Sequence, residues 1–333
     1  MQRAGLVLHH GLTDGASLAR QGQLAEECGY ESLWVTERYC HEETFSMLGY
    51  LAATTRRLRL GVGVVNPYTR SPALTAMGAA TLDRMSGGRL VLGLGRSERD
   101  VIENRLGIPY GEPRRTLEAA VRAVRLLLDG GRIDGGPTPF DLRAKLAVRP
   151  LQPRLPIYLA AIGRPALRLA GALADGVLLN AYVPTGYVPW AIRHVHDAAR
   201  QAGRDPAAIE IACMIVVREG DAEHLRPGLR GRVVRLLCEP HVGEILLRTG
   251  GFDPGIASQT RTRIAGGRLA EAEHLVSDAM VDAFYALGPP ARLAERVAAY
   301  RRQGVTLPLL LPTLEGFEGV ARALGTLPRG DLD

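Results

Sequence analysis

Leu58-Arg59-Leu60-Gly61-Val62-Gly63-Val64-Val65 is the stretch that decides the fold. It is short, apolar on both faces and followed by the turn sequence Asn66-Pro67, which is typical of a fully buried strand. A helical pattern follows, and then a second apolar run, Arg89-Leu90-Val91-Leu92-Gly93-Leu94. Strand, helix and strand in this order indicate the repeating unit of a parallel sheet.

The same alternation extends in both directions from this stretch. The apolar runs are residues 3–9, 31–36, 58–65, 89–94, 156–161, 176–180, 209–217 and 306–311. Helical patterns separate them; one example is Leu117, Val121, Val124 and Leu128, which fall on one helix face. Eight buried strands separated by helices predict an α/β fold in which a parallel sheet closes into a (β/α)8 TIM barrel. A doubly wound open sheet is the structural alternative.

Two stretches do not fit the strand-and-helix repeat. Residues 135–153 contain four prolines and two short alternating pieces, which predict a hairpin or an extended excursion. Residues 221–275 are broken at Pro254-Gly255 and Gly266-Gly267 and predict several short helices. We interpret them as insertions after strands 4 and 7 of a single domain that covers residues 1–333. Pro308 lacks an N–H donor, so a bulge or a locally open seam is expected in the eighth strand.

Composition excludes several classes of protein. The chain has 333 residues, of which 46% are hydrophobic and 23% charged, so it can bury a large core. Its net charge is 41 − 35 = +6, but the arginines are scattered and aromatic residues make up only 5%, so no nucleic-acid partner is expected. No segment has 18 uninterrupted apolar residues, and residues 5–8 are too short for a signal sequence. We therefore expect a cytoplasmic protein with no membrane partner.

In a barrel of this type, the active site lies at the carboxyl ends of the strands. Glycine and other small residues dominate these ends, which predicts a flat ligand across the barrel mouth rather than the paired carboxylates of a hydrolase. The ends read His9-His10, Thr36-Glu37-Arg38, Gly63-Val64-Val65-Asn66, Gly93-Leu94-Gly95, Ala160-Ala161-Ile162-Gly163-Arg164, Asn180, Val217 and Pro312.

Two of these ends suggest ligand contacts directly. The segment from Ala160 to Pro165 joins a buried strand to a helix, and free N–H groups at a helix start, reinforced by Arg164, are a physical means of holding a phosphate. The alternative is a tight turn before a helix. Gly61 and Gly63 weaken a central strand, which indicates a bulge or a close approach of ligand or backbone, or simply packing room inside the barrel.

The histidines and cysteines do not show metal-ligand spacing. His194 and His196 are two residues apart on a helical stretch and diverge, His9 and His10 point to opposite sides of a strand, and no Cys-x-x-Cys pair occurs. No metal site is therefore predicted. The motif Gly93-x-Gly95-x-x-Glu98 lacks the third glycine of a dinucleotide fingerprint, which disfavours NAD in a doubly wound fold.

Glu37 is the candidate acid at the mouth. Because strand residues alternate, Trp34 and Thr36 share one orientation, and we expect Glu37 to face the mouth from the other, redirected by the turn. There it could bond His9 or His10, and these three residues are the candidate catalytic groups. The alternative role of Glu37 is a structural salt bridge to an arginine, Arg38 or Arg70.

Four longer motifs resemble a known family. Residues 25–37 (AEECGYESLWVTE) resemble the second-strand signature of the bacterial-luciferase-like monooxygenase and reductase superfamily. Residues 66–72 (NPYTRSP), followed by 80–83 (ATLD) and 86–95 (SGGRLVLGLG), are similar to the branch that uses the deazaflavin coenzyme F420, especially methylenetetrahydromethanopterin reductase-like proteins. The resemblance continues through residues 156–180 and, weakly, 266–312, and so covers nearly the whole chain.

The resemblance implies a barrel with the deazaflavin lying across the strand ends, its ring backed by a bulge in the third strand. In relatives that bulge often contains a non-proline cis peptide, which by position is Gly63–Val64 here. The phosphate would lie on Ala161, Gly163 and Arg164. The complete coenzyme-binding set implied in this way is Gly63, Val64, Asn66, Gly93, Gly95, Ala160, Ala161, Gly163 and Arg164. A homodimer is the family tendency.

The implied activity is exchange of a hydride between F420 and a small organic substrate, namely an imine, an iminium or an activated alkene. One alternative is an FMN-dependent monooxygenase that uses a partner flavin reductase, and another is a non-catalytic flavin-binding barrel. Two departures from the family concern the substrate. Glu37-Arg38 replaces an acid-histidine pair, and Gly163-Arg164-Pro165 replaces the Gly-Pro-Lys turn of the methanopterin branch.

Overall fold

Eight parallel strands close into a barrel in the computed structural model, which describes all residues except 1, 9, 12–13, 136–138 and 326–333. The barrel strands are β1 (Gln2–Leu8), β2 (Tyr30–Val35), β3 (Arg59–Val62), β4 (Leu90–Leu94), β7 (Ile157–Ala161), β8 (Gly176–Leu179), β9 (Glu210–Glu219) and β11 (Leu307–Leu311). Their order in the ring is β1-β2-β3-β4-β7-β8-β9-β11, and β11 pairs with β1 to close it. The predicted barrel is confirmed, and the open sheet is excluded.

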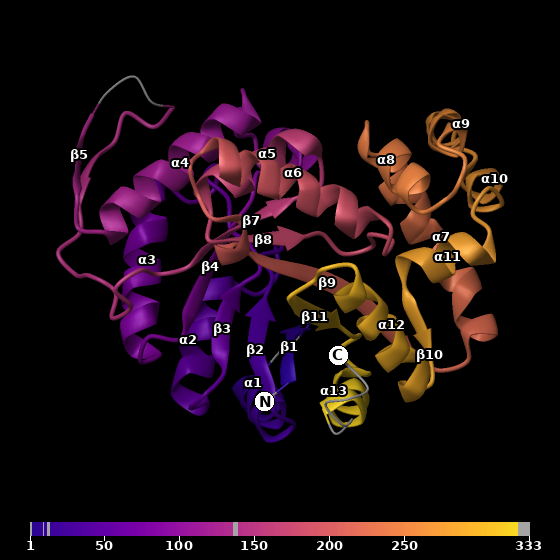
Figure 1. Ribbon diagram of the computed structural model, residues 1–333, viewed down its shortest axis with the longest axis horizontal. Coiled ribbons are helices and arrows are strands. Elements are labelled where there is room, and N and C mark those ends of the chain that lie inside the picture. The colour runs from indigo at the N-terminus through magenta and orange to yellow at the C-terminus, as the bar shows by residue number, and fades with distance from the viewer. Residues whose placement is uncertain (1, 9, 12–13, 136–138, 326–333) are drawn as a thin grey trace.

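Helices cover the outside of the barrel (Figure 1). They are α1 (Gly15–Glu27), α2 (Thr44–Thr54), α3 (Pro72–Met85), α4 (Pro113–Leu128), α5 (Arg164–Leu173), α6 (Tyr187–Gln201), α12 (Pro290–Arg302) and α13 (Phe317–Gly325), with short turns at Asp100–Arg105 and Pro206–Ala208. Each buries one apolar face; α4 buries Leu117, Val121 and Val124, the residues whose spacing predicted it. Its first residue is Pro113, and Gly130 follows its end with a φ of +85°.

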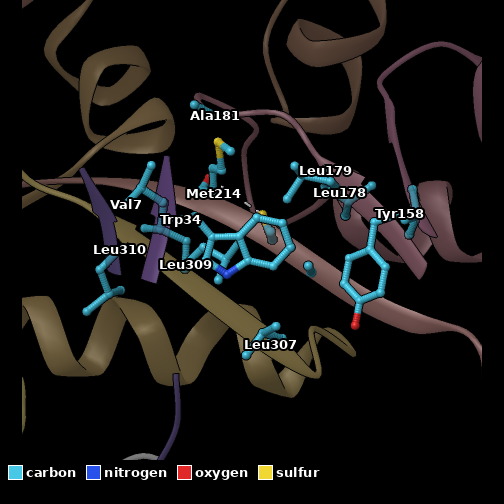
Figure 2. Packing of buried hydrophobic residues seen from close by; sticks show 14 of the residues in the cluster. Val7, Trp34, Tyr158, Leu178, Leu179, Ala181, Met214, Leu307, Leu309 and Leu310 are labelled. Atoms are coloured by element: carbon cyan, nitrogen blue, oxygen red, sulfur yellow. Dashed lines mark hydrogen bonds between the residues drawn. The ribbon is translucent and has the colours of Figure 1, made fainter. Parts of the chain in front are cut away.

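Trp34 fills the middle of the barrel (Figure 2). Its side chain is fully buried, and its ring centroid lies 5.8 Å from that of Tyr158. Gly61 makes room for the indole, because a Cβ on this glycine would lie 2.1 Å from a ring carbon. The indole Nε1 donates to Ser32 Oγ at 2.9 Å. The barrel interior is thus a packed core, and a ligand can be accommodated only above Trp34, at the mouth.

Both predicted insertions are present. Strands β5 (Arg132–Asp134) and β6 (Arg143–Lys145) pair antiparallel and form the expected hairpin. After β9 come the helices α7 (Ala222–Cys238), α8 (Val242–Thr249), α9 (Gly255–Ala265), α10 (Leu269–Glu273) and α11 (Asp278–Phe284), then strand β10 (Ala286–Gly288). With 17 residues, α7 is longer than the short helices that were expected. The helices lie to one side of the barrel (Figure 1), and β10 pairs with the end of β9.

Strand β3 contains the bulge that its glycines predict. Leu60 and Gly61 pair with Leu90 and Val91 of β4, whereas Val65 pairs with Leu94. Between these pairs, β3 therefore contains one residue more than β4. The N–H of Gly63 donates to the Val35 carbonyl at 2.7 Å, and the N–H of Val65 donates to Gly93 at 3.1 Å. The backbone of the bulge is therefore tied to both neighbouring strands.

The peptide bond expected to be cis at this bulge is trans. Within the described part of the chain, every peptide bond is trans, including Gly63–Val64. The extra residue is accommodated by the register shift, while the flanking N–H groups keep their hydrogen bonds, and a non-proline cis bond costs about 3 to 4 kcal/mol. The implied cis peptide is wrong for this chain.

Strand β11 runs through Pro308 without a register shift. It pairs continuously with β9 from Leu307 to Leu311, so the bulge expected at the proline is wrong. Its pairing with β1 begins at Leu309, immediately after the proline, which leaves the seam toward β1 open at that level. The carbonyl of Arg3 on β1 accepts instead from the guanidinium of Arg301 at 2.8 Å. A side chain from α12 thus supplies a donor at the end of this seam.

Part of the motif at residues 86–95 stabilises the amino-terminal end of the barrel. Arg89 precedes β4, and its guanidinium donates to the carbonyls of Ser86, Ala52, Thr55 and Leu58. Burial lowers the pKa of this guanidinium. Because the carboxyl ends of the strands form the opposite end, this part of the motif supports the fold and not the mouth.

No helix among the described residues is long and apolar enough to span a membrane.

Candidate active site

Small residues from three neighbouring strands form a continuous surface at the barrel mouth. A Cβ on Gly95 would lie 3.0 Å from Val64 Cγ2 and 3.4 Å from the Cβ of Ala160, so these residues are in contact. A Cβ on Gly63 would lie 3.0 Å from the Thr36 methyl carbon. Val64 and Ala160 are partly exposed. We call Gly63, Val64, Gly95 and Ala160 the small-residue platform; a planar ring can lie against it.

Gly93 supports this platform from below. A Cβ at this position would lie 2.0 Å from the carbonyl oxygen of Val62 and 2.9 Å from Val64 Cγ1. The bulge in β3 presses its backbone against β4 here, and only a residue without a side chain fits. The space beside Gly93 is occupied by the protein's own backbone, and its implied contact with the coenzyme stays a prediction.

His10 lies beside the platform, at the end of β1. Its Nε2 is 2.8 Å from Thr36 Oγ1, and Thr36 in turn contacts Gly63. Its Nδ1 is 3.7 Å from Glu42 Oε2. The other oxygen of Glu42 accepts from the N–H of Gly11 at 3.0 Å. A carboxylate, an imidazole and a hydroxyl therefore follow one another toward the platform. His9, the other predicted histidine, lies outside the described residues.

The carboxylate of Glu42 is held in its ionised form. Burial opposes ionisation, but hydrogen bonds from backbone N–H groups, including that of Gly11, and the nearby rings of His10 and His41 outweigh burial and lower the pKa of Glu42. The two imidazole rings have centroids 5.2 Å apart. His10, His41 and Glu42 offer ligand atoms within 4.8 Å of one another, a grouping that residue spacing did not reveal. The expectation that the protein has no metal site stays a prediction.

Glu37 does not have the orientation expected from the sequence. The side chains of Trp34 and Thr36 lie on the inner face of β2, since they contact Gly61 and Gly63. The carboxylate of Glu37 accepts from the backbone N–H of Thr44 at 3.0 Å, at the first residue of α2. An acidic group at a helix N-terminus is stabilised there. Among the described residues, Glu37 forms no ion pair with Arg38 or Arg70, the two alternatives suggested, and Arg70 pairs with Glu43.

Asn66 is fully engaged within the protein. It is 4% exposed, and its Oδ1 accepts from the N–H groups of Tyr68 at 2.9 Å and Thr69 at 3.1 Å. Its amide nitrogen donates to the hydroxyl of Tyr39. The side chain thus shapes the turn that follows the bulge. Its predicted contact with the coenzyme stays a prediction.

The start of α5 has the features of an anion site. Gly163 precedes the helix, Arg164 is its first residue and Pro165 its second, so the first turn has free N–H groups. A Cβ on Gly163 would meet only Pro165, at 3.8 Å, so the space before the helix is open. Arg164 is exposed, and Ala161 is buried in β7, two residues before Gly163. The structure thus brings the predicted phosphate residues together beside Ala160 of the platform.

Sequence reasoning missed several residues at the mouth. Thr36 was noted at a strand end but given no role, although its parity with Trp34 places it on the inner face. Glu42 and His41 lie in the loop before α2, where no motif marks them. Arg218 continues β9 one residue past its predicted end, and a charged residue at that point was the available signal.

Most of the chain matches one protein family. Residues 3–307 match the family model described as luciferase-like monooxygenase. The chain is 32% identical over 295 residues to 5,10-methylenetetrahydromethanopterin reductase of Methanolobus tindarius, covering 87% of this chain and 88% of the relative. It is 35% identical over 242 residues to the phthiodiolone/phenolphthiodiolone dimycocerosates ketoreductase of Mycobacterium sp. (strain JLS), covering 67% of this chain and 63% of the relative.

The fold agrees with these sequence matches. The coenzyme F420 dependent tetrahydromethanopterin reductase from Methanopyrus kandleri superposes with a TM-score of 0.83 at 24% identity, over 100% of this chain and 99% of that one. A TM-score of this size over the full length confirms the barrel fold. The chain therefore belongs to the luciferase-like monooxygenase family of oxidoreductases, the family that its sequence motifs indicated.

Proposed function

We propose that this protein exchanges a hydride between coenzyme F420 and a small organic substrate. The observation that carries the proposal is the small-residue platform, which lies beside the bond between His10 Nε2 and Thr36 Oγ1. A flat surface for a ring and a titratable group next to it are what hydride transfer with an accompanying proton requires. The similarity of this chain to the reductase of M. tindarius, which extends over most of both proteins, is a second argument for a reductase.

The residues at the mouth fit a deazaflavin. Val64, Gly95 and Ala160 are in contact, and Val64 and Ala160 are partly exposed, so a ring can lie against the platform. The open N-terminus of α5, with exposed Arg164, would take the coenzyme phosphate. When bound, the coenzyme gives or accepts a hydride at its ring. The protein positions the ring and places the imidazole of His10 beside it, with Nε2 within hydrogen-bond distance of Thr36 Oγ1.

The FMN-dependent monooxygenase is the alternative, because the same platform can support an isoalloxazine ring and the family model bears that name. The two functions differ in coenzyme and in reactivity toward oxygen. We expect calorimetric titration under anaerobic conditions, with each coenzyme in oxidised and reduced form, to give tighter binding of F420 than of FMN. Equal or stronger binding of FMN, with oxygen consumption by the reduced complex, would assign the chain to the monooxygenases. Binding of neither coenzyme contradicts both proposals.

Arg164 tests where the phosphate lies. Replacing it by alanine is expected to weaken F420 binding by about 1.5 to 3 kcal/mol, the usual worth of a charge-assisted contact. The matched control is Arg168→Ala on the same helix, whose guanidinium donates to Gln201. The measurement is calorimetric affinity at moderate salt. If both variants bind like the wild type, the phosphate lies elsewhere.

Substrate identity is a separate question within this proposal. The relatives include a reductase of a pterin-linked one-carbon unit and a ketoreductase at similar identity, so the family match selects no substrate. We propose an imine, an iminium or an activated alkene, and a panel of the three classes can be screened through the visible absorbance of the coenzyme.

A homodimer is also part of the proposal, to be tested by analytical ultracentrifugation.

The carboxylate of Glu37 accepts from the N–H of Thr44, and Glu37→Gln tests whether it also acts as the proton donor that the sequence predicted. A catalytic role requires turnover of a substrate from this panel to fall about 100-fold or more with coenzyme affinity preserved. The control is Glu43→Gln, which removes a charge at the same helix start, where Glu43 accepts from Ser46 N at 2.7 Å. Normal turnover, or a loss of stability equal to that of the control, assigns Glu37 to the N-terminus of α2.

A further inference from the structure

Arg218 lies across the barrel mouth from the bulge in β3. Three strands separate β9 from β3 in either direction around the ring, so the two strands are diametrically opposite. Met214 belongs to the packed interior together with Trp34 (Figure 2), and strand alternation places Val216 and Arg218 on the same inner face. The guanidinium therefore stands above the packed interior, on the side of the mouth that faces the small-residue platform.

One edge of the Arg218 guanidinium is fixed by the protein, and the other edge is available. Its Nη1 donates to the carbonyl of Val217 at 2.7 Å and to that of Leu311 at 3.1 Å. No hydrogen bond among the described residues uses its Nε or Nη2. These two nitrogens form the planar fork that matches a carboxylate with two parallel hydrogen bonds. The fork is pre-oriented, because the two carbonyls hold the rest of the group in place.

Two tyrosines stand next to this arginine. Tyr182 follows β8, Tyr285 precedes β10, and their rings meet edge to face with centroids 5.1 Å apart. Tyr182 has a φ of +65°, a left-handed conformation that is uncommon for a bulky residue and clusters at ligand sites. A second cation, Arg232 on α7, lies over the Tyr182 ring at 5.3 Å. The strained tyrosine is thus held between the barrel and the helical insertion.

The positive charge of this cluster is not neutralised by an ion pair. Several other partly buried arginines have a carboxylate partner; Arg226 pairs with Asp282 through two bonds of 2.9 Å. In the described part of the chain, neither half-buried Arg218 nor exposed Arg232 forms an ion pair. The carboxylate that acts electrostatically on Arg218 belongs to Glu315, which is exposed. Arg218 is half-buried, and this burial lowers the pKa of its guanidinium. Removing a cation from water without an ion-pair partner costs free energy, and a bound anion offsets that cost.

We propose that Arg218, with Arg232 and Tyr182, binds the carboxylate of a planar, unsaturated or aromatic substrate. This inference rests on the proposed function, because it places the anionic end of the substrate opposite the platform that would support the coenzyme ring. The reacting carbon then lies between the two sides of the mouth, near His10. The arginine fork selects the carboxylate, and the tyrosine rings select a flat group attached to it.

Benzoate and benzamide test this site without any coenzyme, so the result does not depend on the proposed function. The two probes have the same shape and differ in charge. Ligand-observed NMR titration of the wild-type protein is expected to give at least tenfold tighter binding of benzoate. Arg218→Met should reduce benzoate affinity at least tenfold, to the level of benzamide, whereas the exposed Arg20→Met on α1 should leave it unchanged.

Arg218→Lys provides a second variant in case the methionine variant does not fold. It keeps the charge but not the fork, so benzoate affinity should fall several-fold while the preference for benzoate over benzamide persists. Equal binding of benzoate and benzamide by the wild type overturns the proposal, as does wild-type benzoate affinity in a folded Arg218→Met. Selective benzoate binding by a protein that binds neither F420 nor FMN supports the carboxylate site and refutes the proposed hydride transfer.

Discussion

Alanine at position 93 is expected to destabilise the protein by about 3 kcal/mol, a large share of the stability of an ordinary domain. The added Cβ would lie 2.0 Å from the carbonyl oxygen of Val62, far inside van der Waals contact. The oxygen belongs to the backbone of β3, the Cβ is fixed directly to the backbone of β4, and the bulge is tied to each of its neighbours, so the clash can be relieved only by separating the strands. Urea unfolding monitored by circular dichroism measures the effect.

Gly49→Ala is the matched control for this substitution. Gly49 lies inside α2, and a Cβ there meets no atom within 4 Å. Because alanine is the better helix former, this variant should gain about 0.5 to 1 kcal/mol. If Gly93→Ala is as stable as the wild type, β3 and β4 do not approach each other this closely. The shape assigned to the platform would then also be wrong.

Asparagine in place of His10 is expected to lower turnover about 10²- to 10⁴-fold while F420 affinity changes less than about twofold. Asparagine keeps a polar group that can bond Thr36 but has no proton to transfer in the physiological range. The reaction is the reduction of a substrate found in the panel, followed through the coenzyme absorbance. A loss confined to kcat indicates a group that acts in the transition state.

Two further variants define the control for this experiment. His224→Asn changes a histidine whose side chain is 87% exposed on α7, so turnover should be unchanged. Thr36→Val keeps the shape of the side chain that contacts Gly63 and removes only the hydroxyl, so it should reduce turnover less than His10→Asn does. Normal turnover in His10→Asn would leave Glu37 and His9 as the candidate proton donors.

The strands could be predicted because each is a continuous apolar run that must be buried on both faces. All eight runs are strands, and most ends agree within one or two residues. The largest difference is in β3, whose regular pairing ends at Val62 and not at Val65. The reason is the bulge, which interrupts the ladder before an isolated bridge restores it at Val65. An apolar pattern reports burial and not the register of a hydrogen-bond ladder.

The site was predictable where it consists of backbone and small residues and not where it consists of side-chain partners. Gly63, Val64, Gly95 and Ala160 follow from strand ends alone, because parallel strands end at one rim. The pairing of His10 with Glu42 depends on how the loop before α2 folds back, which no residue spacing encodes. The orientation of Glu37 was predicted wrongly, because Trp34 and Thr36 occupy the inner face of β2 and Glu37 does not. Its carboxylate instead accepts a hydrogen bond at the start of the next helix.

The bulge in β3 constrains positions 93 and 64 differently, and this difference bears on how such a protein can diversify. Position 93 has no freedom, because backbone fills the place of its side chain. Position 64 is free of that constraint, since its side chain stands over Gly93 and Gly95 at the mouth and is partly exposed. Mutation can therefore alter the surface offered to a ring at position 64 while the scaffold beneath it is inherited unchanged. A barrel built in this way can acquire a new coenzyme preference through one side chain without first losing its fold.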